Sequence, residues 1–413
     1  MYSGYMDLAG VEIINNGRAH VYATARGVPV TCEPCPEIAG AVGDLPYRDP
    51  VTDDAPWYDP QIPQSAGVLG VMGLAVAGFE RGTTERSPVQ LVGDGAALGV
   101  LRRTHREIGY TVLMIAISDC ALSYGLEWLS AALLGGACDG GSCAGDQLCM
   151  FSCCPTGSDT ELRHVYDVGL LDAPQVTQTQ RLSNGIILAT ITFALAAGNP
   201  YIYREPLAAS TNWVDLGSGV VANLDPDAVY DLCQPPPPCL DDPTCPPPPL
   251  PPLPPMPISP CYPTGVDTFK GSVISLGVLD QPQWLETVPV VEVQTGASEM
   301  RRLVIRGWAN PQGIPCADVT DPCSACWHIT IPYLPPGSVL TVDGRTQRAV
   351  VECPSEIGTS TAAPTLYGPE GSSFDWPAFT CPSGFCVEVL SLADTTAPDA
   401  RARVQLVPRS DMG

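Results

Sequence analysis

The stretch Leu101–Gly136, LRRTHREIGYTVLMIAISDCALSYGLEWLSAALLGG, decides the fold of this chain. Its first half contains Ile108–Ile117, an apolar run rich in β-branched residues that predicts a strand. Its second half has the period of an amphipathic helix, because leucines recur every three or four residues. These are Leu122, Leu126, Leu129 and Leu133. We expect one helix over about 118–134, capped by Ser118 and packed through these leucines on a sheet that contains the strand.

The rest of the chain predicts short strands joined by turns. Among its 413 residues are 45 prolines and 40 glycines, which argues against a mainly helical fold. Val11–Ile14 and His20–Ala25 are strand candidates, and two more short strands with glycine turns are expected between Arg81 and Gly99. Apolar residues at every second position of Ile186–Leu195 predict a strand with one buried face.

A second all-β region begins near Thr268. The run Ser338–Val351 contains Asp343-Gly344 between two strand candidates, which predicts a hairpin with a two-residue turn. The other strand candidates of this region are Trp327–Ile331, Ser383–Leu390 and Arg401–Val407. Several short strands separated by turns are typical of a β-sandwich.

Proline concentrates in residues 233–263, where the sequence PPPPLPPLPPMP starts at Pro246. Such a sequence favours the extended polyproline II conformation. We interpret it as a semi-rigid spacer, with a docking segment for an aromatic groove as the alternative. The predicted division is an N-terminal domain of residues 1–232, a proline-rich linker of residues 233–263 and a C-terminal domain of residues 264–413.

Charge excludes two classes of surface ligand. The formal net charge is −24, from 44 acidic and 20 basic residues, so nucleic acid and anionic lipid would be repelled. The densest basic cluster is Arg102, Arg103, His105 and Arg106. On a strand these side chains divide between two faces, which favours solvated or ion-paired groups. We expect no membrane span and, from Met1–Gly10, no secretion signal.

No pattern of residues predicts catalysis. The four histidines, His20, His105, His164 and His328, fall in no recognisable catalytic triad or metalloprotease motif. The glycines of Gly93–Gly99 have the wrong spacing for a dinucleotide loop, so a turn is expected there. We expect neither an enzyme nor a cofactor.

The 18 cysteines carry the one signal that resembles a site. Disulfides are the first interpretation, with structural zinc and buried free thiols as alternatives. The disulfide candidates are Cys32, Cys35, Cys138, Cys143, Cys149, Cys153, Cys154, Cys323, Cys326, Cys381 and Cys386. The zinc alternative uses the thiolates of Cys138, Cys143, Cys149 and Cys153. Cys381 and Cys386 are close enough in sequence to close a small loop.

Four stretches resemble the minor tail proteins of long-tailed actinobacteriophages, and among these the chain is most similar to distal tail or baseplate-hub proteins. They are SDCALSYGLEWLSAAL (Ser118–Leu133), ILATITFALAAGNPYIY (Ile187–Tyr203), IPYLPPGSVLTVDGRTQRAVVEC (Ile331–Cys353) and FDWPAFTCPSGFCVEV (Phe374–Val389). The resemblance covers about half of the chain and includes both predicted domains. The cysteine content and the long proline-rich stretch depart from the family pattern.

The resemblance implies a structural virion protein of the tail tip, made in the host cytoplasm and released by lysis. It implies a mainly β fold: an N-terminal tail-tube-like β-sandwich or barrel that assembles into a hexameric ring, and a C-terminal, galectin-like β-sandwich. The implied partners are further copies of the chain, the tail tube protein, the tape measure protein and other tip proteins. DNA would pass through the channel without specific binding, and the acidic composition predicts a wall on which acidic side chains outnumber basic ones.

Two other classes of function remain open from the sequence. The first is a carbohydrate-binding tail protein whose C-terminal sandwich recognises a glycan of the host cell wall. Trp284, Trp308, Trp327 and Trp376 exposed along one face would favour this carbohydrate-binding alternative. A wall-degrading enzyme would need two carboxylates that flank a groove, and no such pair stands out in the sequence.

Overall fold

The chain folds into two compact units in which strands dominate. The structure, a computed structural model, describes residues 2–28, 35–43, 46–80, 82–92, 94–135, 146–157, 161–207, 211–218, 220–223, 268–277, 282, 284–310, 314–316, 325–355, 358–368, 373, 376–379 and 384–412. Unit 1 comprises Met1–Glu205 together with Pro408–Gly413, and unit 2 comprises Pro206–Val407. The expected mainly β fold is confirmed. No helix among the described residues is long and apolar enough to cross a membrane.

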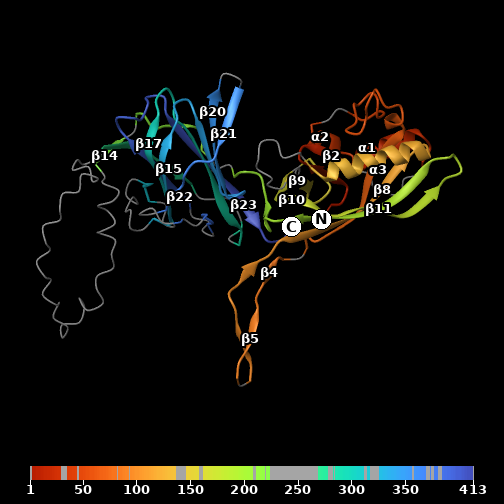
Figure 1. The fold of residues 1–413 in the computed structure, drawn as a ribbon, viewed down its shortest axis with the longest axis horizontal. Helices are drawn as coiled ribbons and strands as arrows, with labels where there is room; N and C mark the ends of the chain where they lie inside the picture. The colour runs from red at the N-terminus through yellow and green to blue at the C-terminus, as the bar shows by residue number, and fades with distance from the viewer. Residues whose placement is uncertain are drawn as a thin grey trace, which may run out of the picture. The chain divides into compact units, whose positions relative to one another are not determined.

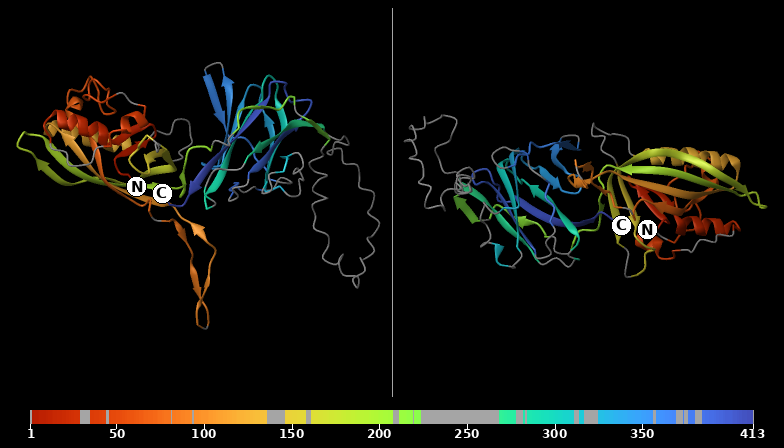
Figure 2. Two further views of the ribbon diagram at one scale, coloured as in Figure 1. Left: turned by 180° about the vertical axis from the view of Figure 1, so that it is seen from behind. Right: turned by 90° about the horizontal axis from the view of Figure 1, so that it is seen from below.

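Unit 1 combines a long antiparallel sheet with short helices (Figures 1 and 2). Its elements are β1 (Tyr5–Leu8), β2 (Val11–Asn15), α1 (Asn16–Ala25), α2 (Ile38–Ala41), the 3₁₀ helix η1 (Ser65–Gly67), β3 (Val68–Ala77), β4 (Thr84–Glu85), β5 (Pro88–Gln90), β6 (Ala96–Leu98), β7 (Arg102–Arg103), β8 (Arg106–Ala116), α3 (Asp119–Leu133), β9 (Asp146–Phe151), β10 (Leu162–Arg181), β11 (Ile187–Ala197) and β12 (Ile202–Tyr203). The ladder β3–β8–β11–β10 continues through β9 and β1 to β2. The described strands form an open sheet rather than a closed barrel.

The expected helix is α3, and it packs on the sheet as predicted. Ser118 caps it, its side chain accepting a hydrogen bond from the N–H of Ala121 (3.1 Å). Leu129 and Leu133 are fully buried and share a core cluster with the β8 side chains. Leu122 and Leu126 are only half-buried at the edge of this cluster. The buried line of the helix therefore runs through Ala121, Gly125, Leu129 and Leu133 rather than through the four leucines.

The strand expected at His20–Ala25 is wrong, because these residues form the end of α1. The Asn15 side chain caps that helix by accepting from the N–H of Arg18 (3.0 Å). Asn16 then binds the edge of β3, accepting from the N–H of Gly73 (2.8 Å) and donating to its carbonyl oxygen (3.2 Å). A cap and a long-range contact thus outweigh the β-branched composition of the segment.

Two strand edges of unit 1 have no ladder partner among the described residues. Beyond Val168, the ladder of β10 continues on the β11 side alone, and the exposed residues there include Leu171 and Val176. The end of β3 after Gly73 is also exposed and is paired on the β8 side only. Unpaired backbone groups along an edge are available to a strand of another chain.

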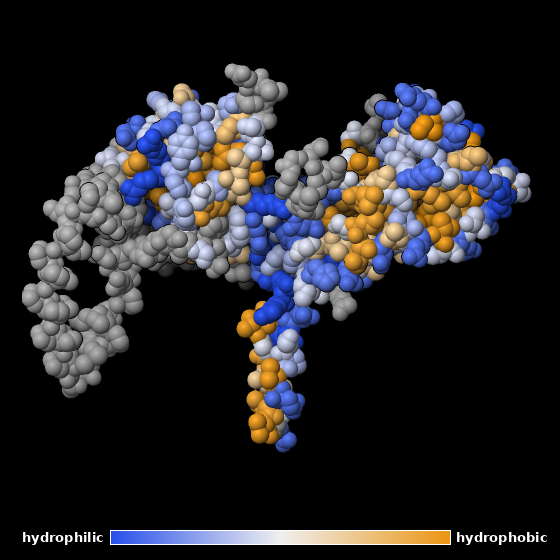
Figure 3. All heavy atoms as spheres, viewed as in Figure 1, coloured by the Kyte–Doolittle hydropathy of each residue, from blue (hydrophilic) through white to orange (hydrophobic). Residues whose placement is uncertain are grey.

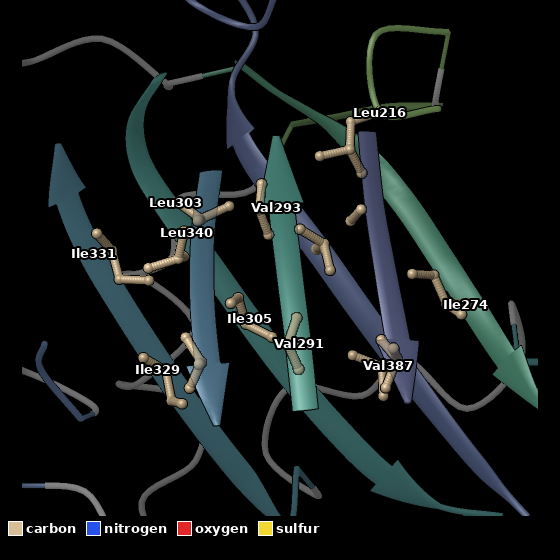
Figure 4. Close-up of a cluster of buried hydrophobic side chains, with 14 of the residues drawn as sticks. Leu216, Ile274, Val291, Val293, Leu303, Ile305, Ile329, Ile331, Leu340 and Val387 are labelled. Atoms are coloured by element: carbon tan, nitrogen blue, oxygen red, sulfur yellow. The ribbon is translucent and has the colours of Figure 1, made fainter. Parts of the chain in front are cut away.

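Unit 2 is a β-sandwich, as expected for the C-terminal domain. Its strands are β13 (Val214–Asp215), β14 (Val220–Asn223), β15 (Thr268–Leu276), β16 (Glu286–Gln294), β17 (Met300–Ala309), β18 (Trp327–Leu334), β19 (Val339–Asp343), β20 (Arg348–Ser355), β21 (Gly358–Ala362), β22 (Phe385–Leu392) and β23 (Arg401–Ser410), of which β23 continues into unit 1. One layer has the order β14–β15–β22–β17–β18 and the other β23–β16–β19–β20–β21. Aliphatic side chains from both layers, such as Ile305 and Val291, meet in the core between them (Figure 4).

The hairpin predicted around Asp343 is present, but its turn differs. β19 and β20 pair as far as Asp343 and Arg348, so four residues connect them instead of two. The carboxylate of Asp343 accepts from the backbone N–H and the guanidinium of Arg345. The N–H of Gly344 binds the carbonyl oxygen of Pro289 (3.0 Å). Because of these contacts, Asp343 is the last paired residue of β19 and Gly344 begins the four-residue connection.

The chain passes from unit 1 to unit 2 after Glu205 and returns to unit 1 after Val407. The predicted linker, residues 233–263, lies outside the described residues, as do the boundaries at 232 and 264. Asn223 and Thr268, which flank the undescribed stretch, face each other in the ladder between β14 and β15 of unit 2.

Candidate functional site

A projecting hairpin is the most distinctive feature of unit 1, and we call residues 82–105 the arm (Figures 1 and 2). Two short ladders build it: Thr84 pairs with Arg103 near the base, and Pro88 pairs with Leu98 further out. Both are separate two-stranded sheets. An isolated two-stranded hairpin is marginally stable in water. We therefore expect the arm to gain conformational stability when another protein surface packs on it.

The outer part of the arm is apolar and exposed to solvent (Figure 3). The side chains concerned are Val89 (65% exposed), Leu91 (51%), Val92 (fully exposed), Leu98 (68%), Val100 (79%) and Leu101 (47%). Single exposed apolar residues are ordinary on protein surfaces, but here six of them lie on one short projecting hairpin. Such a group is typical of a protein–protein contact.

The charge of the arm is opposite to that of the chain. Arg86, Arg102 and Arg103 outnumber Glu85 and Asp94, which leaves a formal charge of +1 with His105 neutral. The chain as a whole carries −24, so the other residues carry −25. The arm is thus weakly basic, whereas the rest of the chain is strongly acidic.

The C-terminal segment holds the arm at its base. One carboxylate oxygen of Asp411 accepts from the backbone N–H (3.0 Å) and the hydroxyl (2.7 Å) of Thr83. The other accepts from the hydroxyl of Thr84 (2.8 Å). The carbonyl oxygen of Thr83 accepts in turn from the N–H (3.0 Å) and hydroxyl (3.1 Å) of Thr104 on the second strand. Asp411 is therefore linked to both strands of the arm.

Arg106, at the end of the arm, joins three separate segments. Its guanidinium donates to the carbonyl oxygens of Gly78 (2.6 Å), Pro200 (3.0 Å) and Asp411 (2.5 Å). The side chain is 1% exposed, and this burial lowers the pKa of the guanidinium although Asp411 and Glu80 oppose the effect. Arginine has the planar set of donors that such a three-way contact needs.

Two further contacts support the base of the arm. The ring of Tyr201 lies under the guanidinium of Arg103 from the arm, 4.9 Å away, and under that of Arg409 from the C-terminal segment, 3.7 Å away. Gly78 precedes the arm with φ +104°, and a β-carbon there would lie 2.0 Å from the carbonyl oxygen of Glu107. Only glycine allows this approach.

The four residues of the basic cluster found in the sequence lie in different surroundings in the structure. Arg102 lies opposite Glu85 in the ladder, Arg103 lies over Tyr201, His105 contacts Glu107 (3.2 Å) and Arg106 is buried. A cavity of about 530 Å³ beside them is lined partly by Glu80, Glu85 and Glu107. Among the described residues, no group of three or more His, Cys, Asp or Glu side chains is placed to hold a metal ion.

The cysteines form bonds that their spacing did not predict. Cys35 is bonded to Cys154, and Cys316 to Cys386. Cys386 is thus bonded to a cysteine 70 positions earlier in the sequence rather than to Cys381. Its partner, Cys316, was not among the candidates. Cys149 and Cys326, which were candidates, are free thiols in the structure, and Cys153 is exposed. Cys32, Cys138, Cys143, Cys323 and Cys381 lie outside the described residues, so the zinc alternative is not tested.

One group of polar side chains was missed because its members are distant in sequence. The Sγ of Cys149 lies 3.3 Å from Nδ1 of His164, whose Nε2 lies 3.0 Å from a carboxylate oxygen of Glu205. Burial, with Asp7 nearby, raises the pKa of the Cys149 thiol to about 12. A thiol held in its protonated form is a poor nucleophile. We assign this group no catalytic role.

The four tryptophans named for the carbohydrate-binding alternative do not lie exposed along one face. Trp284 is 70% exposed, whereas Trp308 and Trp327 are buried and Trp376 packs against the core. Stacking of a sugar needs the face of an exposed ring, so these positions do not favour the carbohydrate-binding alternative.

Comparison with known proteins gives weak similarities. No family model matches the chain, and no curated protein matches it. The crystal structure of SPP1 Dit (gp 19.1), described as a paradigm of the hub adsorption apparatus in phages that infect Gram-positive bacteria, is 9% identical, with a TM-score of 0.36 and coverage of 84% of this chain and 94% of that one. The phage P2 baseplate in its activated conformation with Ca is 11% identical, with a TM-score of 0.34 and coverage of 83% and 92%. Both scores are too low to carry an argument about function.

Proposed function

We propose that the chain is a structural protein of a phage tail tip that assembles with further copies of itself through the arm. The arm is the observation that carries the proposal: an unsupported hairpin with six exposed apolar side chains gains stability when a partner covers it. A second copy fits this role, because it supplies the acidic surface that a basic arm attracts. The open edges of β10 and β3 offer further places for strands of a neighbour to pair.

The proposed assembly is a closed ring, hexameric as the resemblance to distal tail proteins implies. It would join the tail tube to the tip, contact the tape measure protein and leave a channel for DNA. A chain with 44 acidic and 20 basic residues can line that channel with negative charge, so DNA passes without adhering. No catalytic activity and no cofactor belong to this proposal.

Replacing three arm residues should separate the copies. In the full chain, Val89→Ser, Val92→Ser and Leu98→Ser together remove exposed apolar surface without touching the core. We expect wild type to form a closed oligomer and the triple variant to remain monomeric in size-exclusion chromatography with light scattering and in electron micrographs. Leu134→Ser, at a residue that is 72% exposed outside the arm, is the matched control and should assemble normally.

Two results would contradict the proposal: a wild-type chain that stays monomeric at every concentration, or a triple variant that assembles as well as wild type. Deleting residues 264–413 is not a suitable test. It removes Pro408–Gly413, which belong to unit 1 and hold the base of the arm.

A further inference from the structure

The arm is attached to its unit at the base, and the last residues of the chain supply much of that attachment. Asp411 provides both oxygens of its carboxylate to Thr83 and Thr84 and its carbonyl oxygen to Arg106. The guanidinium of Arg409 lies over the ring of Tyr201, 3.7 Å from the ring centroid. These residues are separated from the arm by more than 300 positions in sequence.

The contacts at the base of the arm are directed hydrogen bonds to one residue, Asp411, rather than apolar packing. Hydrogen bonds to a charged group are stronger than those between neutral groups. Here a single carboxylate receives three of them from the first strand, and Thr104 connects the second strand to the same point. Without the carboxylate of Asp411, the N–H of Thr83 loses its acceptor and the buried guanidinium of Arg106 loses the opposite charge that lies 3.7 Å away. The base of the arm would then be free to open.

We propose that residues Pro408–Asp411 are a latch that orders the arm, so that only a chain in which these residues are folded in place presents the arm to a second copy. This inference rests on the proposed function. Residues 408–411 follow the whole of unit 2 in sequence and are synthesised after it. A chain whose synthesis has not reached residue 411 therefore has the arm residues but lacks the group that orders them.

Acid is not the physiological signal for this latch. Burial alone would raise the pKa of Asp411, but the hydrogen bonds from Thr83 and Thr84 and the charge of Arg106 outweigh it and lower the pKa. A carboxyl group with a lowered folded-state pKa stabilises the fold above its unfolded pKa of about 3.9, and this contribution is lost as the pH falls through the folded value. Glu80, the other charged group near Arg106, also has a lowered pKa, because backbone N–H groups bind its carboxylate. The latch therefore holds at neutral pH and in weak acid.

Hydrogen–deuterium exchange of the full chain tests the latch directly. Asp411→Ala should raise amide exchange in residues 82–105 by about tenfold or more, as expected for the loss of charge-assisted hydrogen bonds. Exchange in β8 and β11 should be unchanged. Met412→Ala, next to it and 55% exposed, is the matched control and should behave as wild type. The same Asp411→Ala variant should assemble less well than wild type at equal concentration.

The outcomes separate this inference from the proposed function. If exchange at Thr83, Thr84 and Thr104 is the same in Asp411→Ala and wild type, the latch does not exist. If exchange rises but assembly is unaffected, the latch does not control assembly and the inference is overturned. If wild type itself never assembles, the proposed function fails, whereas the exchange result still decides whether Asp411 orders the arm. The triple arm variant should lose assembly with normal exchange at the base.

Discussion

Replacing Leu129 with alanine should lower the free energy of unfolding of unit 1 by about 2–5 kcal/mol, the usual cost of a large-to-small change in a core. Leu129 is fully buried and packs in the cluster that includes Val112 and Met114 of β8. Close approach of helix and sheet leaves little room to relax: a β-carbon at Gly125 would lie 2.7 Å from the sulfur of Met114. A cavity left by the lost side chain would therefore remain largely open.

Two leucines of the same segment provide controls for this measurement. Leu126→Ala should cost less than Leu129→Ala, because Leu126 is half-buried at the edge of the core cluster. Leu134→Ala, at a residue that is 72% exposed, should change stability by no more than about 0.5 kcal/mol. Denaturant unfolding, monitored by amide hydrogen exchange in β8, measures each effect. Equal losses at the three positions would show that α3 does not bury the face seen in the structure.

Removing the disulfide between Cys316 and Cys386 should destabilise unit 2 by about 4 kcal/mol. The bond joins residues that are 70 positions apart, and closing a loop of that length restricts the unfolded chain strongly. Both sulfurs are buried beside Trp308, so a reduced pair would also leave two thiols in an apolar cluster. The double variant Cys316→Ala with Cys386→Ala removes the bond without leaving a thiol free to pair elsewhere.

Thermal unfolding with and without a reducing agent measures this contribution. Cys326→Ala, which changes an exposed free thiol, should melt as wild type does. Mass spectrometry of the unreduced protein should recover the peptides that contain Cys316 and Cys386 as one linked species. A protein that melts at the same temperature in either condition would contradict the predicted role of the bond. Disulfides persist in oxidising surroundings, which agrees with a protein that acts after release from a cell.

Periodicity in the sequence was sufficient where structure is local. The leucine spacing of residues 118–134 predicted α3. The alternation in Ile186–Leu195 predicted a strand, observed as β11, whose buried side chains occupy every second position. Both patterns report which face of an element is apolar, and that is a property of neighbouring residues. Composition likewise predicted the mainly β fold and the sandwich of unit 2.

Only the tertiary structure decided the features that join distant residues. The turns between Arg81 and Gly99 were expected, yet a sequence of short strands does not show whether they fold back on a core or project from it. The latch depends on Asp411 meeting Thr83, and the disulfide of Cys386 depends on the sheet bringing Cys316 beside it. Asn223 likewise pairs with Thr268 although the two residues are far apart in sequence. Contacts of this kind are set by the packing of whole elements, which no local pattern of residues encodes.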